Sequence, residues 1–189
     1  MASLLLHSCC GPCTTYTVEY WRGQQLEVTA FWFNPNIHPF QEHQRRLEAM
    51  QALAQAVDLP LIVPPGYQML HFLRRVVRKE GDRCLYCFRL RLSQTAAQAR
   101  ERGMDGFSTT LLISPYQKHE LLRQIGEEVA RKHGVAFLYH DLRSGYQRSR
   151  QLSKERNLYR QQYCGCLYSE WERFAKITIP SGPFPFEEG

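Results

Sequence analysis

Cysteine is the residue type in this sequence with the clearest capacity for chemistry. The seven cysteines are an odd number, which does not fit a framework built from disulfides alone. They fall into three clusters, namely Cys9, Cys10 and Cys13, then Cys84 and Cys87, and finally Cys164 and Cys166. Clustered thiols in a protein of the reducing cytoplasm indicate metal binding or redox chemistry rather than structural cross-links.

Two simpler uses of these cysteines explain only part of the set. Cys10 and Cys13 enclose Gly-Pro, which is the dithiol motif of thioredoxin-like oxidoreductases, and a helix N-terminus lowers the pKa of such thiols. A disulfide-exchange site of this kind leaves five of the cysteines unexplained. A closed zinc site with four thiolates, for which Cys84 and Cys87 have suitable spacing, leaves three unused.

Seven thiolates divide naturally into four and three. Four suit a 4Fe–4S cluster, whereas three leave one coordination position open on a single catalytic metal. Neighbouring residues at a strand end are expected to point to opposite sides, so Cys9 and Cys10 should belong to different centres. Cys164 and Cys166, on either side of Gly165, should point the same way. We therefore predict a cluster held by Cys10, Cys13, Cys84 and Cys87, and a mononuclear metal held by Cys9, Cys164 and Cys166.

The pattern of apolar residues predicts the elements that must position these thiols. Short apolar or β-branched runs predict five strands, at residues 4–6, 27–33, 61–63, 106–110 and 136–139. Apolar residues with a period near 3.6 predict helices over residues 40–57, 85–99 and 121–129. This alternation is typical of a three-layer α/β fold, a parallel sheet with helices on both faces, whose sites lie beyond the carboxyl ends of the strands. The first cysteine cluster directly follows the first predicted strand, at this edge.

Length and composition favour a single globular domain. The 189 residues, 43% of them hydrophobic, suit one α/β domain over residues 1–179 with a helical C-terminal part, followed by an extended tail over residues 180–189. No apolar run approaches the ~20 residues that a membrane helix needs, and the N-terminus lacks the features of a signal peptide. We therefore expect a cytoplasmic protein without a membrane segment.

The positive charge of the chain is concentrated beside the second and third cysteine clusters. The formal net charge is +6; residues 71–91 carry seven basic and two acidic side chains, and residues 143–160 carry six basic and one acidic. Two solvated helix faces would explain such runs, but their position next to cysteine clusters favours an RNA or phosphate partner. The predicted phosphate contacts are Arg74, Arg75, Arg78, Arg148 and Arg150.

Five segments in this order resemble the motifs of a known family. They are Leu-Leu-His-Ser-Cys-Cys-Gly-Pro-Cys at residues 5–13, Phe-Asn-Pro-Asn-Ile-His-Pro at residues 33–39, Arg-Cys-x-x-Cys-x-x-Leu at residues 83–90, Thr-Thr-Leu-Leu-Ile-Ser-Pro-Tyr at residues 109–116 and Tyr-Cys-Gly-Cys at residues 163–166. Their combination resembles the cobalamin-independent epoxyqueuosine reductases of the QueH family, and the resemblance covers about residues 4–171.

The resemblance implies a fold, a reaction and cofactors. The fold would be like that of adenine-nucleotide α-hydrolases and PP-loop proteins, with the cysteine turn in place of their phosphate-binding turn. The reaction would be the last step of queuosine synthesis, in which epoxyqueuosine in a tRNA anticodon is reduced to queuosine. The cofactors would be a 4Fe–4S cluster and a separate iron, in agreement with the division of the thiols into four and three. Some members of the family carry a carboxylate at the position of Cys13.

This reaction sets requirements that the sequence must meet. Loss of the epoxide oxygen as water consumes two electrons and two protons, and a redox metal must carry the electrons. The open-sited metal would act as a Lewis acid on the epoxide oxygen, and the cluster would deliver electrons one at a time. The chain has no flavin or nicotinamide fingerprint, so we expect an external donor such as a ferredoxin or flavodoxin.

Several polar residues beside the predicted strand ends are candidates for proton donation or base recognition. The candidate proton donors are His7, His38, Tyr116, His140 and Asp141. The residues expected to act in catalysis are Cys9, Cys164, Cys166, Tyr116 and Asp141. Asn34 and Asn36 are expected to hold their loop or to read the base, and Tyr116 could also stack on it. Local hydrogen bonding is the structural alternative for each polar residue in this set.

Three other functions fit part of the sequence. A PP-loop thiolation enzyme would need an ATP-binding glycine–serine turn after the first strand, where this chain has Ser-Cys-Cys-Gly-Pro at residues 8–12. A zinc-stabilised RNA-binding module would contain zinc and no iron. A thiol oxidoreductase would be active without metal.

Overall fold

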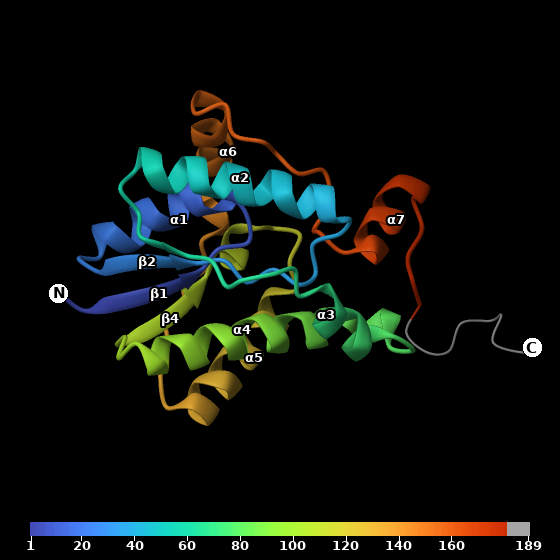
Figure 1. Cartoon of the computed structure of the whole chain (residues 1–189), viewed down its shortest axis with the longest axis horizontal. Coiled ribbons are helices and arrows are strands. Elements are labelled where there is room, and N and C mark those ends of the chain that lie inside the picture. The colour runs from blue at the N-terminus through green and yellow to red at the C-terminus, as the bar shows by residue number, and fades with distance from the viewer. Residues whose placement is uncertain (181–189) are drawn as a thin grey trace, which may run out of the picture.

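A parallel five-stranded sheet lies at the centre of the computed structural model, which describes residues 1–180 (Figure 1). The strand order is β3-β2-β1-β4-β5, and all neighbouring strands are parallel. The strands are β1 (Ser3–His7), β2 (Glu27–Phe31), β3 (Leu61–Ile62), β4 (Gly106–Thr109) and β5 (Ala136–Phe137). The predicted three-layer parallel α/β fold is confirmed, and each strand lies within or beside its predicted range.

Helices cover both faces of the sheet (Figure 1). On one face lie α1 (Gly11–Gly23), α2 (Phe40–Ala56) and α6 (Tyr146–Glu155), and α1 packs against both of the others. The other face is covered by α4 (Arg83–Glu101) and α5 (His119–His133), with α3 (Met69–Val76) packed against α4. The last helix, α7 (Leu167–Ala175), lies at the end of the molecule where α4 begins.

Both faces of β1 are buried, because the side chains of a strand alternate between the two layers of helices. Leu4 and Leu6 pack in one cluster with Val18 of α1 and Met50 of α2. Leu5 belongs to a second cluster, formed largely by α4 and α5. This apolar run explains why β1 is the central strand, so the chain after it emerges in the middle of the carboxyl edge of the sheet.

The turn after β1 brings the first cysteines to the start of a helix. Cys10 is the N-cap of α1, with an extended backbone, and its sulfur accepts a hydrogen bond from the Cys13 N–H at 3.3 Å. Pro12 suits the first turn of a helix, where its missing N–H would have no helical partner. A Cβ atom at Gly11 would lie 2.9 Å from the Ala49 carbonyl oxygen. Glycine at this position therefore lets α2 pack closely over the cysteine turn.

The segment after α6 returns to the carboxyl edge of the sheet. The His38 N–H donates to the Gly165 carbonyl at 2.8 Å, which ties the loop before α7 to the loop after β2. The sequence predicts a helical C-terminal part, which α6 and α7 form, but does not locate α3, α6 or α7. The predicted tail over residues 180–189 lies, except for residue 180, outside the residues that the structure describes.

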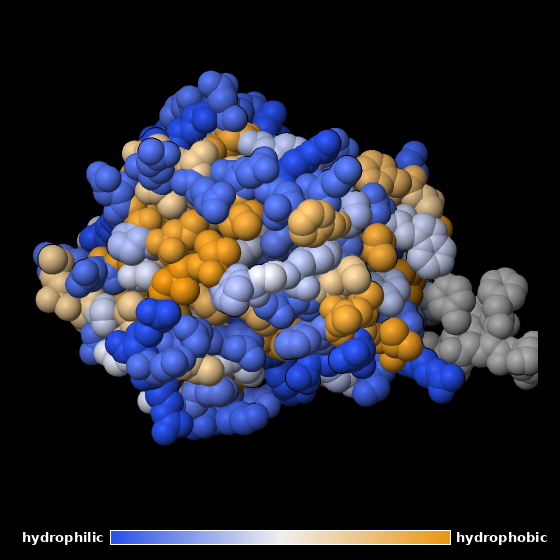
Figure 2. Space-filling view, viewed as in Figure 1, coloured by the Kyte–Doolittle hydropathy of each residue, from blue (hydrophilic) through white to orange (hydrophobic). Residues whose placement is uncertain are grey.

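Hydrophilic side chains cover most of the face shown in Figure 2. Hydrophobic atoms gather in two patches, a larger one on the left of the view and another near α3 (Figure 2). At α3, Leu70 and Val77 are about half exposed, and the basic side chains of Arg74 and Arg75 are also exposed. Within residues 1–180, no helix is both long enough and apolar enough to cross a membrane.

Candidate metal centre

The three sulfur atoms of the first cysteine cluster meet beyond the carboxyl end of β1. The Sγ atoms of Cys9 and Cys10 are 3.8 Å apart, and these two and Cys13 Sγ all lie within 4.8 Å of one another. Thiolates about 2.3 Å from one tetrahedral metal are about 3.8 Å from each other. The three thiols therefore have spacing close to that of ligands on a single metal, with a fourth position open.

The expectation that Cys9 and Cys10 point to opposite sides is wrong. It assumes a pleated strand at these residues, but β1 ends at His7. Cys10 instead caps α1, and the turn carries both sulfur atoms to the same side.

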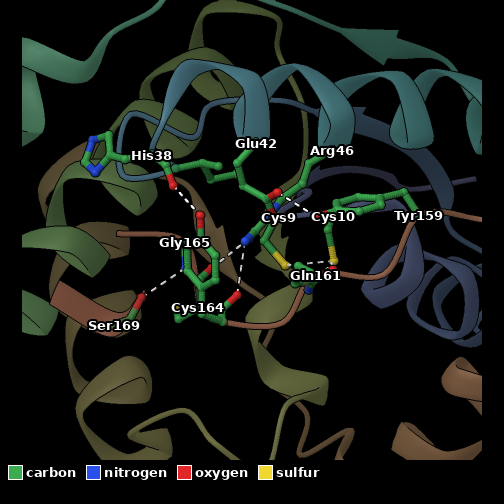
Figure 3. A network of polar contacts seen from close by, with 12 residues as sticks. Cys9, Cys10, His38, Glu42, Arg46, Tyr159, Gln161, Cys164, Gly165 and Ser169 are labelled. Carbon is green, nitrogen blue, oxygen red and sulfur yellow. Dashed lines mark hydrogen bonds and ion pairs between the residues drawn. The ribbon is translucent and has the colours of Figure 1, made fainter. Parts of the chain in front are cut away.

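Polar side chains from distant segments surround this group of sulfur atoms. The Thr110 hydroxyl donates to Cys9 Sγ at 3.2 Å. The Gln161 amide donates to Cys10 Sγ at 3.0 Å (Figure 3). Hydrogen bonds with the Cys10 and Cys13 thiols hold the pKa of Cys9 well below its usual value. Such donors favour the thiolate, which is the form that binds metal.

The other four cysteines form a second group near the start of α4. Cys84 and Cys87 lie in the first turns of α4, and Cys164 and Cys166 directly precede α7. Burial raises the pKa of Cys87 to about 12, and the thiols of Cys164, Cys166 and Cys84 add to this effect. Burial and the two C-terminal thiols likewise raise the pKa of Cys84. The four thiols are thus close enough to repel one another when ionised, and a shared cation would relieve that repulsion.

The structure brings three thiols together, whereas the other four are near enough to affect one another's pKa, so the close neighbours differ from those predicted. The three are Cys9, Cys10 and Cys13, and the four are Cys84, Cys87, Cys164 and Cys166. The sequence prediction instead places Cys10 and Cys13 on one cluster together with Cys84 and Cys87. All seven thiols are free of disulfides. Which centre each thiol binds stays a prediction.

A network from α2 holds the loop that carries Cys164 (Figure 3). Arg46 is buried on α2 and donates to Glu42 at 2.7 Å. The other guanidinium nitrogens donate to the carbonyl oxygens of Cys164 and Tyr163, at 2.8 and 3.1 Å. Tyr159 donates to the second Glu42 oxygen at 2.6 Å. The guanidinium therefore fixes the loop backbone, while the carboxylate balances its charge.

Arg91 of α4 lies between the two groups of thiols. Its Nε donates to His7 Nε2 at 3.2 Å, and its Nη2 donates to Asn34 Oδ1 at 2.8 Å. Its Nη1 lies 3.7 Å from Cys87 Sγ. Asn34 also donates to the Ser8 carbonyl at 2.9 Å and is buried, so it ties the loop after β2 to the turn after β1.

Asn36 is buried beside the loop of the third cysteine cluster. A Cβ atom at Gly165 would lie 3.0 Å from Asn36 Nδ2, so the two residues are in close contact. Asn36 Oδ1 has no hydrogen-bond partner within residues 1–180. Asn36 thus lines the loop of the third cluster instead of facing solvent.

Three of the predicted proton donors have no acidic proton at neutral pH. Burial lowers the pKa of His7 to about 3 and that of His38 to about 4, so neither is an imidazolium. Arg143 donates to the Asp141 carboxylate through Nε at 2.9 Å and lowers its pKa to about 2. Asp141 therefore does not fit the role of a catalytic acid.

Tyr116 keeps an exposed position next to Tyr146 of α6. Its ring centroid lies 6.0 Å from that of Tyr146, in an edge-to-face arrangement. Burial raises the pKa of Tyr146, and Tyr116, Arg150 and Cys13 are close enough to act on it as well. The two rings therefore form an aromatic pair that lies near a thiol and a basic side chain. The last candidate, His140, stacks instead on a tyrosine of α1.

Five residues of the site were missed by sequence analysis. They are Arg46, Arg91, Gln117, Tyr146 and Gln161, of which Gln117 donates to Cys164 Sγ at 3.4 Å. A signal existed for Arg91, because it interrupts the apolar face of a predicted helix between the buried Phe88 and Thr95. The other four are ordinary polar residues in the sequence, and only the fold brings them to the thiols.

The predicted phosphate contacts lie on two helices. Arg74, Arg75 and Arg78 are exposed on α3 or just after it, and none forms an ion pair within residues 1–180. Arg148 and Arg150 are exposed on α6, where Arg148 lies 3.9 Å from a glutamate of the same helix. These helices lie on opposite sides of the sheet (Figure 1).

The donor set fits an iron–sulfur site. Thiolates select soft or borderline metals, including iron in iron–sulfur clusters, zinc and copper(I). The buried cation of Arg91 has no carboxylate partner within the described part of the chain, and metal-bound thiolates would balance it. The residues present are therefore compatible with anionic metal centres at this edge of the sheet.

Comparison with known proteins identifies the family. Residues 4–172 match the family described as "Epoxyqueuosine reductase QueH". A protein of this name from Dehalococcoides mccartyi is 49% identical over 178 residues, which cover 94% of this chain and 98% of that protein. Proteins of the same name from Thermotoga maritima and Streptococcus pyogenes are each 36% identical, covering 93% and 88% of this chain and 94% and 70% of theirs.

Solved structures also include a similar fold. A protein from Methanocaldococcus jannaschii described as a predicted subunit of tRNA methyltransferase has a TM-score of 0.52 and 10% identity, covering 82% of this chain and 75% of its own. At this identity the likeness concerns the fold alone. The sequence relatives carry the stronger argument, because the match with their family includes all three cysteine clusters. This chain therefore belongs to the epoxyqueuosine reductase QueH family.

Proposed function

We propose that this protein reduces epoxyqueuosine in tRNA to queuosine, with iron centres held by its seven cysteines. The observation that carries the proposal is the gathering of free thiols from three distant segments at one edge of the sheet, in a member of this family. The epoxide oxygen leaves as water, so two electrons and two protons are consumed. When bound, the iron centres would supply electrons and a Lewis acid for the departing oxygen.

The sulfur positions support a division of the ligands between two centres. The close spacing of Cys9, Cys10 and Cys13 favours a mononuclear iron with an open position. The mutual influence of the four remaining thiols, Cys84, Cys87, Cys164 and Cys166, favours the 4Fe–4S cluster. The division predicted from sequence, with 10, 13, 84 and 87 on the cluster, is the competing assignment.

Metal analysis tests the cofactor. Iron, zinc and acid-labile sulfide per chain are measured on anaerobically purified protein. We expect about four sulfides with four to five irons. Roughly one zinc without sulfide would contradict the proposal and would support a zinc-stabilised RNA-binding module.

Two matched substitutions distinguish the assignments of the ligands. If Cys84, Cys87, Cys164 and Cys166 hold the cluster, Cys164→Ala loses the cluster spectrum, whereas Cys13→Ala keeps it and loses one iron. The division predicted from sequence gives the reverse pattern. Loss of all sulfide in both variants would contradict two independent centres.

The residues around the open position support binding of a base that has left its stack. Tyr146 is close enough to Cys13 to be influenced by it and pairs with the exposed ring of Tyr116, and such rings stack on splayed-out bases of RNA. Arg150 lies beside this pair, where it would contact a phosphate. Tyr116 would give the proton of its hydroxyl to the departing oxygen.

The reaction needs an electron donor from outside the chain. We propose a ferredoxin or flavodoxin as that donor, and a cytoplasmic setting where tRNA and such donors occur together. The test incubates iron-loaded protein with reduced ferredoxin and an anticodon stem-loop or full tRNA that contains epoxyqueuosine, and nucleosides are then analysed by mass spectrometry. Formation of queuosine is expected. Lack of conversion of full tRNA by protein with complete iron and sulfide would contradict the proposed reaction.

A further inference from the structure

Arg91 carries a positive charge in the protein interior without an acidic partner. Only 1% of the residue is exposed, and its hydrogen bonds go to the ring of His7 and the amide of Asn34. No carboxylate within residues 1–180 forms an ion pair with its guanidinium. A buried cation without a counter-charge is strongly unfavourable. Some other anionic group should therefore balance it.

Two other buried arginines of this region show the usual arrangement. Arg46 pairs with Glu42 at 2.7 Å, and Arg83 pairs with Glu172. Both guanidinium groups are thus neutralised by carboxylates of this chain. The lack of such a partner is a property of position 91 and does not apply to buried arginines of the fold in general.

Thiols occupy the place that a carboxylate would take. Nη1 of Arg91 lies 3.7 Å from Cys87 Sγ. Burial by itself lowers the pKa of Arg91, but the thiols of Cys87, Cys9 and Cys164 are close enough to outweigh this effect. The guanidinium is therefore flanked by members of both thiol groups.

The hydrogen bonds of Arg91 also fix its orientation. Its Nε–H donates to His7 Nε2, so the other ring nitrogen carries the hydrogen and donates to Thr109 Oγ1 at 2.9 Å. Asn34 holds the opposite end of the guanidinium and is itself bonded to the Ser8 carbonyl. The charge is thus held in place by strands β1 and β4 and by the loop after β2.

We propose that Arg91 is the counter-charge of the metal-bound thiolates and raises the reduction potential of the centre that they form. This inference rests on the proposed function, because it requires metal at the thiols. Each electron taken from the external donor adds negative charge beside Arg91. A fixed cation in a medium of low dielectric constant stabilises that reduced state. Arg91 acts through charge on the centre and is a positioning residue that does not contact the epoxide.

The test separates the effect of the positive charge at position 91 from the effect of the shape of the side chain. The midpoint potential of the cluster is measured by anaerobic redox titration with EPR detection, together with iron and sulfide content. Arg91→Met is expected to shift the potential to more negative values, whereas Arg91→Lys, which keeps the charge, stays near the wild type. The matched control is Arg89→Gln on the same helix, because Arg89 is partly exposed and paired with a glutamate. This variant should not shift the midpoint potential.

A second variant neutralises the charge without removing the arginine. Asn34→Asp has nearly the same shape and places a carboxylate oxygen at the position 2.8 Å from Nη2, while it also removes the hydrogen bond to the Ser8 carbonyl. It should shift the potential in the same direction as Arg91→Met. If Arg91→Met loses its iron while Arg91→Lys retains it, the requirement for charge is also supported.

Several results would overturn the inference. One is an unchanged potential in both Arg91→Met and Asn34→Asp. A second is an equal shift of the potential in Arg91→Lys and Arg91→Met. A third is loss of iron in both variants. In either case the shape of the arginine side chain would matter rather than its charge. Wild-type protein without iron and sulfide would overturn the proposed function, and this inference with it. Full iron and sulfide with unmoved potentials would overturn the role of Arg91 alone.

Discussion

Side chains of the same type have different chemical properties in this protein because their surroundings differ. Hydrogen bonds lower the pKa of the Cys9 thiol, whereas burial raises the pKa of the Cys87 thiol. Arg46 has a carboxylate partner, and Arg91 has thiols instead. The role of each residue therefore follows from its neighbours, and residue type alone only narrows the choice.

The hydroxyl of Tyr116 is expected to matter for catalysis and its ring for binding. Tyr116→Phe keeps the ring, so kcat should fall by a factor of about 10²–10⁴ with little change in KM for tRNA. Tyr146→Ala should show the opposite pattern, a higher KM with a smaller effect on kcat. Steady-state kinetics under anaerobic conditions measure both. An unchanged kcat in Tyr116→Phe would limit this residue to stacking.

His38 should make the folded protein less stable in acid. Burial lowers its pKa to about 4 in the folded state, against about 6.5 in the unfolded chain. Between these values the unfolded chain binds more protons, so the free energy of unfolding decreases as the pH falls from 6.5 towards 4. His38→Gln removes this contribution. Urea unfolding at a series of pH values should therefore show a shallower slope in the variant, and an equal slope would refute the assignment.

Two short segments between helices and strands position the thiols. The turn between β1 and α1 gathers the first group, and the loop before α7 carries Cys164 and Cys166 to the start of α4. Helix α2 touches both segments, through the close approach of Ala49 to Gly11 and through the bonds of Arg46. Its packing therefore determines whether the two groups lie near each other.

The backbone at Gly165 should not tolerate a side chain. Its φ is +152°, and a Cβ atom would lie 3.0 Å from Asn36 Nδ2 and 3.2 Å from Ile37 Cγ1. Gly165→Ala is expected to cost about 1–3 kcal/mol of unfolding free energy and to reduce iron content. The matched control is Gly23→Ala, where a Cβ atom has no neighbour within 4 Å and the change should stay within about 1 kcal/mol. Denaturant unfolding and iron analysis compare the two, and equal effects would count against strain at Gly165.

Breaking the Arg46–Glu42 ion pair of α2 should lower the free energy of unfolding, because it leaves a buried charge without a partner. Arg46→Met strands the Glu42 carboxylate, and a loss of about 3–5 kcal/mol of unfolding free energy is expected. Glu42→Gln in the same variant should restore part of this loss, since neither charge then remains. A double-mutant cycle by urea unfolding measures the coupling. Additive effects of the two substitutions would show that the pair is not coupled.

At the scale of the whole molecule, exposed basic side chains lie on two sides of the sheet. The net charge is +6, and exposed arginines lie on α3 and on α6, on opposite sides of the sheet. Arg150 of α6 is near the aromatic pair beside the first group of thiols. A tRNA whose anticodon reaches the open metal position would therefore lie against α6, and the α3 arginines could contact other phosphates of the same molecule.

Binding of tRNA should depend strongly on salt. Arg148→Gln with Arg150→Gln is expected to weaken binding and to reduce the slope of log Kd against log salt by about one per lost phosphate contact. Arg74→Gln with Arg75→Gln tests the α3 side in the same way. The control is Arg131→Gln, an exposed residue of α5 outside both basic runs. Affinity that does not change with salt would contradict the phosphate contacts.

Five strands, three of the helices and the candidate metal ligands could be predicted from the sequence alone. Periodicity is a local property, so the apolar runs and amphipathic segments could be recognised without knowledge of their partners. Strand ends were less accurate: the second strand was predicted over residues 27–33 but ends at Phe31. Trp32 and Phe33 follow it as buried residues, and the Trp32 N–H still donates to the Ile62 carbonyl of β3. Three cysteine clusters are likewise visible in sequence, and together with the motifs at residues 33–39 and 109–116 they carry the family resemblance.

Tertiary structure decided how the thiols are grouped and what surrounds them. The grouping of Cys9 with Cys10 follows from a helix cap, which the alternation of a strand does not describe. The contacts of Arg91 and Arg46 join residues up to 118 positions apart, and their hydrogen bonds form only when α2 and α4 pack against the sheet. Such contacts depend on the packing of whole elements and not on local spacing. This is why the ligands could be named from the sequence, whereas their neighbours and charge balance could not.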